Sequence, residues 1–356
     1  MAIDKIKLRA LAKDKDERLF AEGDMLDAKN ITVSTEGEST NGIVKNVLGT
    51  VPGTASTTDD QIPSEDARVV GSVSDDANQK VYFFVWSTSA ANHGIYEYDT
   101  SNNTYKAVLK SSVLAFPQYG FVKADLINGD FQKNETNQTI IYFTDGVNAP
   151  RKINATRALL GEFDSYNDVD IKHAISVVKS PSLSAPTVVL KTDSSRTTNN
   201  LYGSVLQFAV QYVYKDGERS ALSPHSKVVF PRHMSMQGIV SNDADIAASY
   251  TKENLAEINT GWTSTPSSLF GYSEEVSKIR ILGRNKNTNP FFIVDEFDPN
   301  SSLVKNGSTV YDKDTGIYKF FNDGLYLYES SAVTDKVFDD VPQKAKSQAI
   351  TGDRLM

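Results

Sequence analysis

The segment from Leu206 to Ser226, LQFAVQYVYKDGERSALSPHS, constrains the fold of this chain more than any other. Large apolar side chains occupy every second position of its first half, namely Phe208, Val210, Tyr212 and Tyr214. A period of two is the signature of a β-strand, whose side chains point to alternate faces of a sheet. The Asp216-Gly217 pair then predicts a tight two-residue turn, because these residue types tolerate positive φ angles. We therefore predict a strand from Val205 to Lys215, a turn, and a returning strand from Glu218 to Phe230.

Further strand signals follow at intervals of roughly ten residues along the chain. In the first half they are Val81 to Trp86, Gly94 to Asp99, Tyr105 to Leu109 and Thr139 to Thr144. In the second half they are Thr187 to Lys191, Ser277 to Arg284, Phe291 to Phe297 and Ile317 to Phe321. Turns are predicted at pairs such as Asn41-Gly42, Asn128-Gly129 and Asp323-Gly324. This rhythm predicts an all-β fold, as in a sandwich, barrel or propeller.

Helical signals are few. The segment TRALLGEF at 156–163 and the stretch from Asp168 to Lys179 predict short helices, and prolines at 181 and 186 interrupt the pattern. A third short helix is predicted from Lys5 to Leu19. Residues 50–67 predict a loop, and the long polar stretch 231–273 predicts a loop of a length that is often functional.

Composition argues against several classes of function. The 356 residues include no cysteine, so disulfides and thiolate catalysis are excluded. We expect neither a secretory signal nor a membrane span, since no window approaches the about 18 apolar residues that a span needs. The net charge of −8 is unlike the basic surface of a protein that grips nucleic acid. Ordinary solvated acidity is the simpler explanation of this charge, and an acidic surface would also let DNA slide past.

No pattern of residues singles out a metal site. The four histidines, His93, His173, His225 and His233, form no i, i+4 pair and have no cysteine to join them, so we expect no zinc site. The segment from Asp312 to Gly316 resembles a calcium loop only in part. Its glycine comes one position early, and Asp323 stands where the twelfth position needs a glutamate. We predict an exposed turn there.

Catalytic patterns are equally weak. Acids that could pair across a cleft as in a glycosidase include Asp125, Asp130, Asp145 and Asp295, but their spacing selects no two of them. Ser220 and Ser223 lie near His225 without a third partner for a triad. Some alternating aromatics could stack on sugars or bases, although alternation favours a core position: Tyr212, Tyr214, Tyr318 and Phe320. We therefore predict a chain that is not an enzyme, with no catalytic, cofactor-binding or metal-binding residue and no cofactor.

Five segments carry a family resemblance when they are taken together and in order. They are FAEGDMLDAKNITV near the start, TIIYFTDGVNAPRKINATRAL at 139–159, the segment 206–226, VSKIRILGRNKNTNPFFIVDEFD at 276–298, and FFNDGLYLY with VFDDVPQKAKSQAITGDRL near the end. They resemble the tail nozzle proteins of short-tailed double-stranded DNA bacteriophages, including the muzzle proteins of crAss-like phages. Residues 50–80 and 231–273 carry no such resemblance.

The resemblance implies a β-propeller interrupted by an inserted fibronectin-like β-sandwich. It divides the chain into an N-terminal arm at 1–30, the first part of the propeller at 31–172, the inserted sandwich at 173–335 and a strand returning to the propeller at 336–356. The family's propeller continues past this point. We therefore expect further polypeptide after Met356, or a neighbouring chain, to complete the sheet, because an unpaired edge is prone to aggregation.

The resemblance also implies a structural role in the virion. Copies would close into a ring, which we expect to be hexameric, at the distal end of the tail tube. That ring would extend the DNA exit channel and help to retain and release the genome. Expected partners are further copies and the other tail, ring or adaptor, and fibre proteins, with the host cell surface as a further contact. Genomic DNA would pass without specific binding, and assembly would take place in the host cytoplasm.

Two alternatives stay open. A receptor-binding or adhesin module would use a long loop such as 231–273 to contact its partner. A polysaccharide-degrading tail enzyme would need two carboxylates about 5–10 Å apart across a cleft.

Overall fold

The computed structural model describes residues 31–33, 44–46, 52–130, 137–230, 253–262, 273–286, 290–334, 341–351 and 354–355. The chain divides into two compact units, Met1–Thr54 and Ala55–Met356. In the first unit, β1 (Ile31–Val33) pairs antiparallel with β2 (Val44–Asn46). The predicted helix from Lys5 to Leu19, the Asn41-Gly42 turn and most of the polar stretch 231–273 lie outside the described residues.

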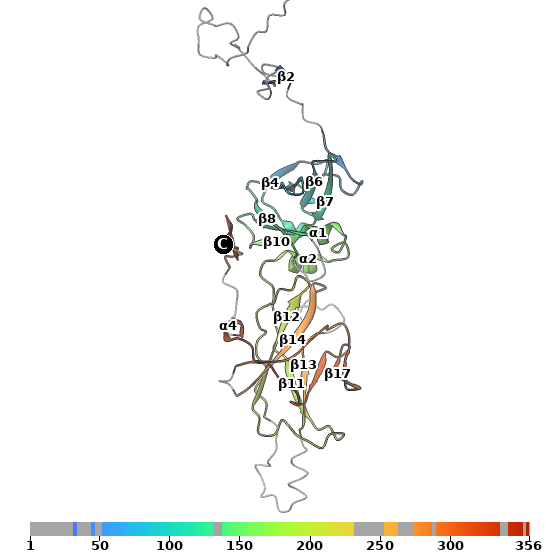
Figure 1. Ribbon diagram of the computed structural model, residues 1–356, viewed down its shortest axis with the longest axis vertical. Helices are drawn as coiled ribbons and strands as arrows, with labels where there is room; N and C mark the ends of the chain where they lie inside the picture. The colour runs from blue at the N-terminus through green and yellow to red at the C-terminus, as the bar shows by residue number, and fades with distance from the viewer. Residues whose placement is uncertain are drawn as a thin grey trace, which may run out of the picture. The chain divides into compact units, whose positions relative to one another are not determined.

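The second unit begins with a region that we call the first β assembly, residues 55–180 (Figure 1). Its five-stranded antiparallel sheet has the order β3-β7-β6-β5-β4. These strands are β3 (Thr54–Ala55), β4 (Ala67–Asp75), β5 (Lys80–Ser87), β6 (Gly94–Asp99) and β7 (Thr104–Lys110). A three-stranded sheet follows in the order β10-β9-β8, made of β8 (Lys123–Gly129), β9 (Gln138–Thr144) and β10 (Arg151–Asn154).

Short helices complete the core of the first β assembly. They are the 3₁₀ turns η2 (Ala90–Asn92) and η3 (Ser112–Leu114) and the helices α1 (Ala155–Leu159) and α2 (Asp168–Ile175). Phe84 of β5, Ile95 of β6 and Ile141 of β9 have no exposed surface and belong to one cluster with residues of both helices. Tyr82, Phe84 and Trp86 of β5 face this cluster, whereas Val81 and Phe83 on the opposite face are only half-buried, so cover on both faces of this apolar run is incomplete.

Two further sheets form the second β assembly, residues 187–329 (Figure 1). One has the order β11-β13-β18-β17-β16, with β11 (Thr187–Lys191), β13 (Leu255–Asn259), β16 (Leu303–Lys305), β17 (Ser308–Asp312) and β18 (Ile317–Phe320). The other has the order β12-β14-β15, with β12 (Leu206–Tyr214), β14 (Val276–Asn285) and β15 (Phe292–Phe297). Side chains of both sheets, such as Phe208, Ile281 and Ile258, fill one core cluster.

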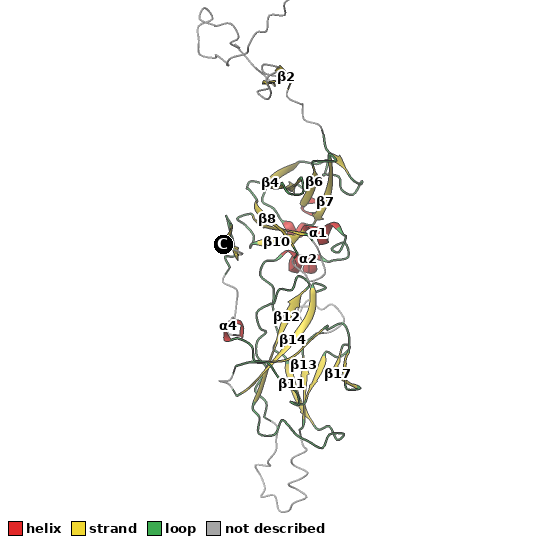
Figure 2. Cartoon of the chain, in the orientation of Figure 1, coloured by secondary structure: helices red, strands yellow, loops and turns green. Residues whose placement is uncertain are grey.

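The predicted all-β character is confirmed, since strands greatly outweigh helices in the described chain (Figure 2). Nine predicted strands appear as β5, β6, β7, β9, β11, β12, β14, β15 and β18, with ends that differ by at most one residue. Within the described residues no sheet closes on itself. The propeller, the fibronectin-like topology and the predicted domain boundaries stay predictions.

Some predictions are wrong in detail. Helix α2 ends at Ile175 rather than near Lys179, because Ser176 already has an extended backbone. The Asn128-Gly129 pair lies at the end of β8 and not in a turn. Strands such as β4 and β13 carry weak or polar strand signals and were not predicted.

In the last part of the described chain, α4 (Ser331–Thr334) is followed by a small hairpin of β19 (Ile350–Thr351) and β20 (Arg354–Leu355).

The predicted returning strand from Glu218 to Phe230 is also wrong. Residues 219–229, which we call the serine strap, use three residues for every two of β12. The amides of Ser220, Ser223 and Ser226 donate to β12 carbonyls at 2.8–2.9 Å. Their Oγ atoms accept from β12 amides at 2.9–3.0 Å. The strap therefore covers the backbone edge of β12 without forming a regular strand.

The turn before the strap holds three residues rather than two. Tyr214 N donates to Glu218 O at 2.9 Å, and Gly217 N donates to Tyr214 O at 2.8 Å. Gly217 has a φ of 79°, whereas Asp216 has no positive φ. This is a type I turn followed by a left-handed glycine. The two-residue turn with two positive φ angles occurs instead at Asn306-Gly307, between β16 and β17.

Candidate functional site: a charged junction between two β assemblies

The turn after β12 lies against the first β assembly and places two carboxylates beside two lysines. Lys152 Nζ lies 2.7 Å from Asp216 Oδ2 and 2.7 Å from Glu218 Oε1. Lys179 Nζ lies 3.2 Å from Asp216 Oδ2 and 3.8 Å from Glu218 Oε2. We call these four residues the four-charge cluster. It joins β10 and the segment after α2 to the turn that follows β12.

Burial makes this cluster unlike a surface ion pair. The side chains of Lys152 and Lys179 are 6% and 2% exposed, and that of Asp216 is 12% exposed. Burial raises the pKa of the Asp216 carboxyl, but the two lysines outweigh it and bring this pKa to about 2. Burial also opposes the charge on Lys152, yet its two short contacts with the acids raise the pKa of that lysine. For Lys179, whose contacts are longer, burial dominates and lowers the pKa.

Local structure explains how each lysine reaches the cluster. Lys152 lies opposite Tyr142 of β9, and because Ile153 faces the core cluster, the side chain of Lys152 points to the other face of the sheet. Lys179 lies in the segment after α2, where its Nζ donates to His173 O at 3.2 Å and lies 5.0 Å from the centre of the Tyr214 ring. A buried ammonium group gains from both contacts, since it has lost its water.

A second network lies beside the cluster and centres on Glu275, which has no exposed surface. Arg157 of α1 donates from Nη2 to Glu275 Oε1 at 2.8 Å and from Nη1 to Oε2 at 3.3 Å. Tyr166 OH donates to Oε1 at 2.7 Å, and Lys215 Nζ donates to Tyr166 OH at 2.7 Å. Burial opposes the charge on Arg157, but the hydrogen bonds to Glu275 outweigh it and raise the pKa of the guanidinium. Burial and the nearby Glu275 charge raise the pKa of the Tyr166 phenol.

Together these groups form what we call the charged junction, and in every ion pair that crosses it the cation comes from the first β assembly and the anion from the second. The first β assembly supplies cations: Lys152, Arg157 and Lys179. The second β assembly supplies anions: Asp216, Glu218 and Glu275. Opposite charges set on two facing surfaces are typical of a docking interface.

Sequence reasoning did not find this junction. Arg157 and Glu275 are 118 residues apart, so no local periodicity reports their contact. One signal was present in the turn, where Asp216 and Glu218 flank Gly217 and place two acids at a hairpin tip.

Within the described residues, the histidines take part in structural contacts. His93 is buried, its Nδ1 accepts from Phe116 N at 2.8 Å, and burial lowers the pKa of its ring. The ring of His173 lies 6.2 Å from that of Tyr214. The ring of His225 lies 5.1 Å from that of Phe291. His233 lies outside the described residues. Among the described residues, no group of three histidines or acids is placed to hold a metal ion.

The predicted exposed turn from Asp312 to Gly316 is confirmed. Gly316 N donates to Asp312 O at 2.8 Å, with Gly316 at a φ of 67°. Thr315 Oγ1 donates to Asp312 Oδ2 at 2.8 Å, and the turn joins β17 to β18.

The acids considered for catalysis take local structural partners. Asp125 lies in β8, opposite Tyr142. Asp130 Oδ1 accepts from Asn137 N at 2.6 Å. The carboxylate of Asp145 accepts from the amides of the two residues that end its turn, and that of Asp295 accepts from Tyr318 OH at 2.9 Å.

The serines and aromatics are likewise accounted for by structure. The hydroxyls of Ser220 and Ser223 bond backbone groups in the serine strap. The core position predicted for four alternating aromatics is confirmed: Tyr212, Tyr214, Tyr318 and Phe320.

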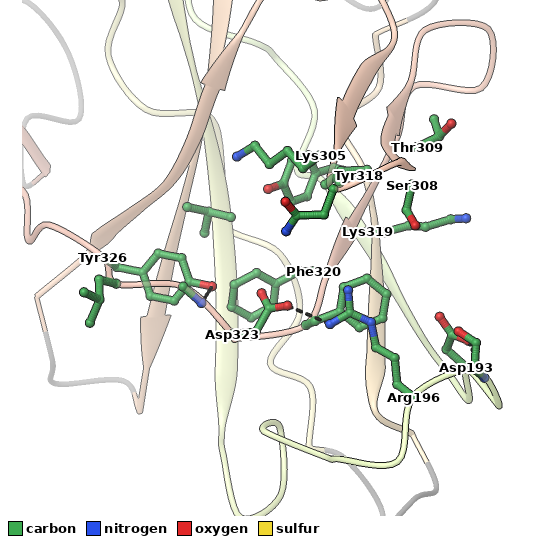
Figure 3. Close-up of a pocket in the computed structure, with 17 residues that line it drawn as sticks. Asp193, Arg196, Lys305, Ser308, Thr309, Tyr318, Lys319, Phe320, Asp323 and Tyr326 are labelled. Atoms are coloured by element: carbon green, nitrogen blue, oxygen red, sulfur yellow. Dashed lines mark hydrogen bonds and ion pairs between the residues drawn. The ribbon is translucent and has the colours of Figure 1, made fainter.

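A groove of about 690 Å³ opens in the second β assembly, where the loop after β11 meets β18 and the residues that follow it (Figure 3). Arg196 lies over the Phe321 ring at 3.6 Å, and its Nη1 lies 2.6 Å from Asp323 Oδ2. Lysines and acids both line the groove, and the exposed Leu325 borders it. Arginine and aromatic side chains such as Arg196 and Phe321 are enriched where proteins meet.

In a comparison with protein families, the model of the Crassvirus muzzle protein matches residues 4–251. The matched span includes the four-charge cluster and ends before Glu275. Comparison with curated proteins finds no match. No helix in the described parts of the chain is long and apolar enough to cross a membrane.

Proposed function

The chain belongs to the Crassvirus muzzle protein family, and we propose that its copies form a closed ring at the distal end of the phage tail. Membership makes the chain a structural protein of a crAss-like phage tail, where it contacts other virion proteins. In our proposal the ring extends the DNA exit channel and helps to retain and release the genome. The observation that carries the proposal is the family match over residues 4–251.

The surface of the first β assembly supports contacts with neighbouring chains. Tyr119 and Phe121 are 81% and 83% exposed and lie two residues apart, next to the edge strand β4. The guanidinium of Arg68 lies 5.8 Å from the centre of the Tyr119 ring. Exposed aromatic side chains are enriched where proteins meet. A closed ring needs two different surfaces on each copy, because its contacts run head to tail.

We also propose that the chain is not an enzyme and that DNA passes it without specific binding. The net charge of −8 favours passage over retention, because phosphate groups are repelled by an acidic wall. A strongly basic channel wall in the assembled ring would contradict this part of the proposal.

Mass photometry of the purified chain, alone and co-produced with the neighbouring tail proteins, tests ring formation. We expect a single closed assembly of defined copy number, visible as rings by negative-stain microscopy. A chain that stays monomeric in both preparations would contradict the ring.

The groove at Arg196 favours a second candidate function, a receptor-binding module. This candidate predicts that the purified chain binds host cells and that replacing Arg196 and Phe321 by alanine abolishes binding. Replacement of Lys106, an exposed residue of β7 that lies outside the groove, is the control. Equal binding by the groove variant and the control would exclude this role for the groove.

A further inference from the structure

We infer that the charged junction is a releasable docking contact: ion pairs and hydrogen bonds hold the two β assemblies in one arrangement, and the assemblies can part without opening either core. The inference concerns this chain alone and does not depend on the ring.

Each assembly has a hydrophobic core of its own. The cluster of the first β assembly runs from Val70 to Ile175, and that of the second runs from Leu201 to Phe320. Among the described residues the two clusters share no member. Tyr166 of the first cluster and Tyr214 of the second contact groups across the junction. Separation of the assemblies therefore uncovers parts of these two side chains and leaves most of each core in place, so most of the hydrophobic driving force for folding is kept.

The contacts across the junction are mainly polar. The four-charge cluster forms one part, and the Glu275 network with Arg157 and Tyr166 forms the other. A further hydrogen bond runs from Glu274 N to Asp170 Oδ1 at 3.0 Å. The exception is Tyr214, which belongs to the second core and lies against Lys179.

This chemistry favours the closed state only modestly, so the closed state predominates and the parted state stays accessible. Charges buried in the junction have lost their water, and their mutual attraction does little more than compensate for that loss. On parting, every one of these groups is hydrated again. An apolar interface has no such compensation, because its surfaces stay unfavourably hydrated once they are exposed.

The connecting backbone is also placed to act as a hinge. One connection is the segment 176–186, which lies between α2 and β11, contains bends and no helix or strand, and includes Pro181 and Pro186. Lys179 lies within this segment, so closure of the four-charge cluster fixes the hinge itself. Loop residues at the ends of secondary structure commonly absorb the backbone change of a domain movement.

A distance measurement between the two assemblies tests the inference directly. Because the chain has no cysteine, single cysteines introduced at two exposed lysines can carry nitroxide labels without further changes. Lys106→Cys on β7 labels the first assembly, and Lys319→Cys on β18 labels the second. Pulsed electron paramagnetic resonance then gives the distribution of distances between the labels in the full chain.

Two matched pairs of substitutions separate the junction from general charge effects. Asp216→Asn with Glu218→Gln removes the acids of the four-charge cluster. The control pair, Asp314→Asn with Glu257→Gln, removes the same charge from the second assembly at positions away from the junction. The ion pair of Glu257 with Lys191 is more exposed than the pairs of the four-charge cluster.

We expect one narrow distribution in the unsubstituted and control proteins at low salt. The junction variant should show a broad second population at low salt. We expect the fraction of this population to be at least about tenfold higher than in the unsubstituted protein, because removal of one side of a close charge pair weakens a contact by that order. A junction variant as narrow as the control at every salt concentration would overturn the inference.

Circular dichroism and thermal melting establish that each variant is folded. If the junction variant does not fold, the salt dependence of the labelled, otherwise unsubstituted protein decides. We expect its second population to grow as salt is raised to about 1 M, where the Debye length is about 3 Å. An unchanged narrow distribution over that range would equally overturn the inference.

Discussion

Replacement of Arg157 by methionine tests how strongly the Glu275 network is coupled. Glu275 accepts two hydrogen bonds from Arg157 and one from Tyr166, and it has no exposed surface. Methionine is apolar and offers no hydrogen-bond donor. In the variant, the buried carboxylate of Glu275 therefore keeps the Tyr166 hydroxyl as its remaining side-chain donor. Removing one partner of a buried ion pair costs about 3–5 kcal/mol. We expect the free energy of unfolding to fall by up to that amount, because parting of the assemblies would hydrate Glu275 again and so limit the loss.

A double-mutant cycle identifies the origin of this loss. Glu275→Gln removes the stranded charge, so Arg157→Met combined with Glu275→Gln should be less destabilised than the sum of the two single variants by about 2 kcal/mol. Arg68→Met is the control, because its ion pair with Asp66 is exposed and should contribute less than about 1 kcal/mol.

Urea unfolding followed by tryptophan fluorescence measures each of these changes. The chain has two tryptophans, Trp86 in the first assembly and Trp262 in the second, so each can report on its own assembly after the other is replaced by phenylalanine. Additive effects in the cycle, or an Arg157→Met loss no larger than that of Arg68→Met, would refute the reasoning.

The remaining predictions concern single positions. The folded-state pKa of Asp216, about 2, lies below its ordinary 3.8, so its contribution is present above pH 4 and is lost as the pH falls toward 2. Asp216→Asn should therefore remove about 2 kcal/mol at neutral pH and flatten the acid side of a melting-temperature profile. Gly316→Ala should prevent stable folding or cost more than about 3 kcal/mol, because its Cβ would lie 2.1 Å from Trp262 O at positive φ. Gly217→Ala meets no atom within 4 Å and should cost about 1 kcal/mol by the same chemical denaturation. Ser223→Ala leaves the buried amide of Val210 without its hydroxyl acceptor and should cost about 1–3 kcal/mol.

Alternation in the sequence was sufficient to predict the inner face of β12. Phe208, Val210, Tyr212 and Tyr214 all lie in the core of the second assembly. Ala209, on the opposite face, packs in a separate small cluster with Leu282 and Phe291. Period-two patterning predicts such faces because successive side chains of a strand point to opposite faces of the sheet.

Features that depend on distant partners could not be predicted in this way. The sequence of the serine strap predicts a strand because part of it is apolar. In the structure, serines at every third position instead form hydrogen bonds with the edge of β12. Strand β13 has mixed polarity and gains its place by pairing with β11 and β18. The charged junction consists of groups from distant segments, and only the folded chain brings them together.

Cryo-electron microscopy of the tail in intact phage particles tests the structural role most directly. We predict copies of this chain in a closed ring around the tail axis, at the distal end of the DNA channel, with an acidic inner wall. A map that places the chain off the axis, as separate copies that do not close into a ring, would contradict that role.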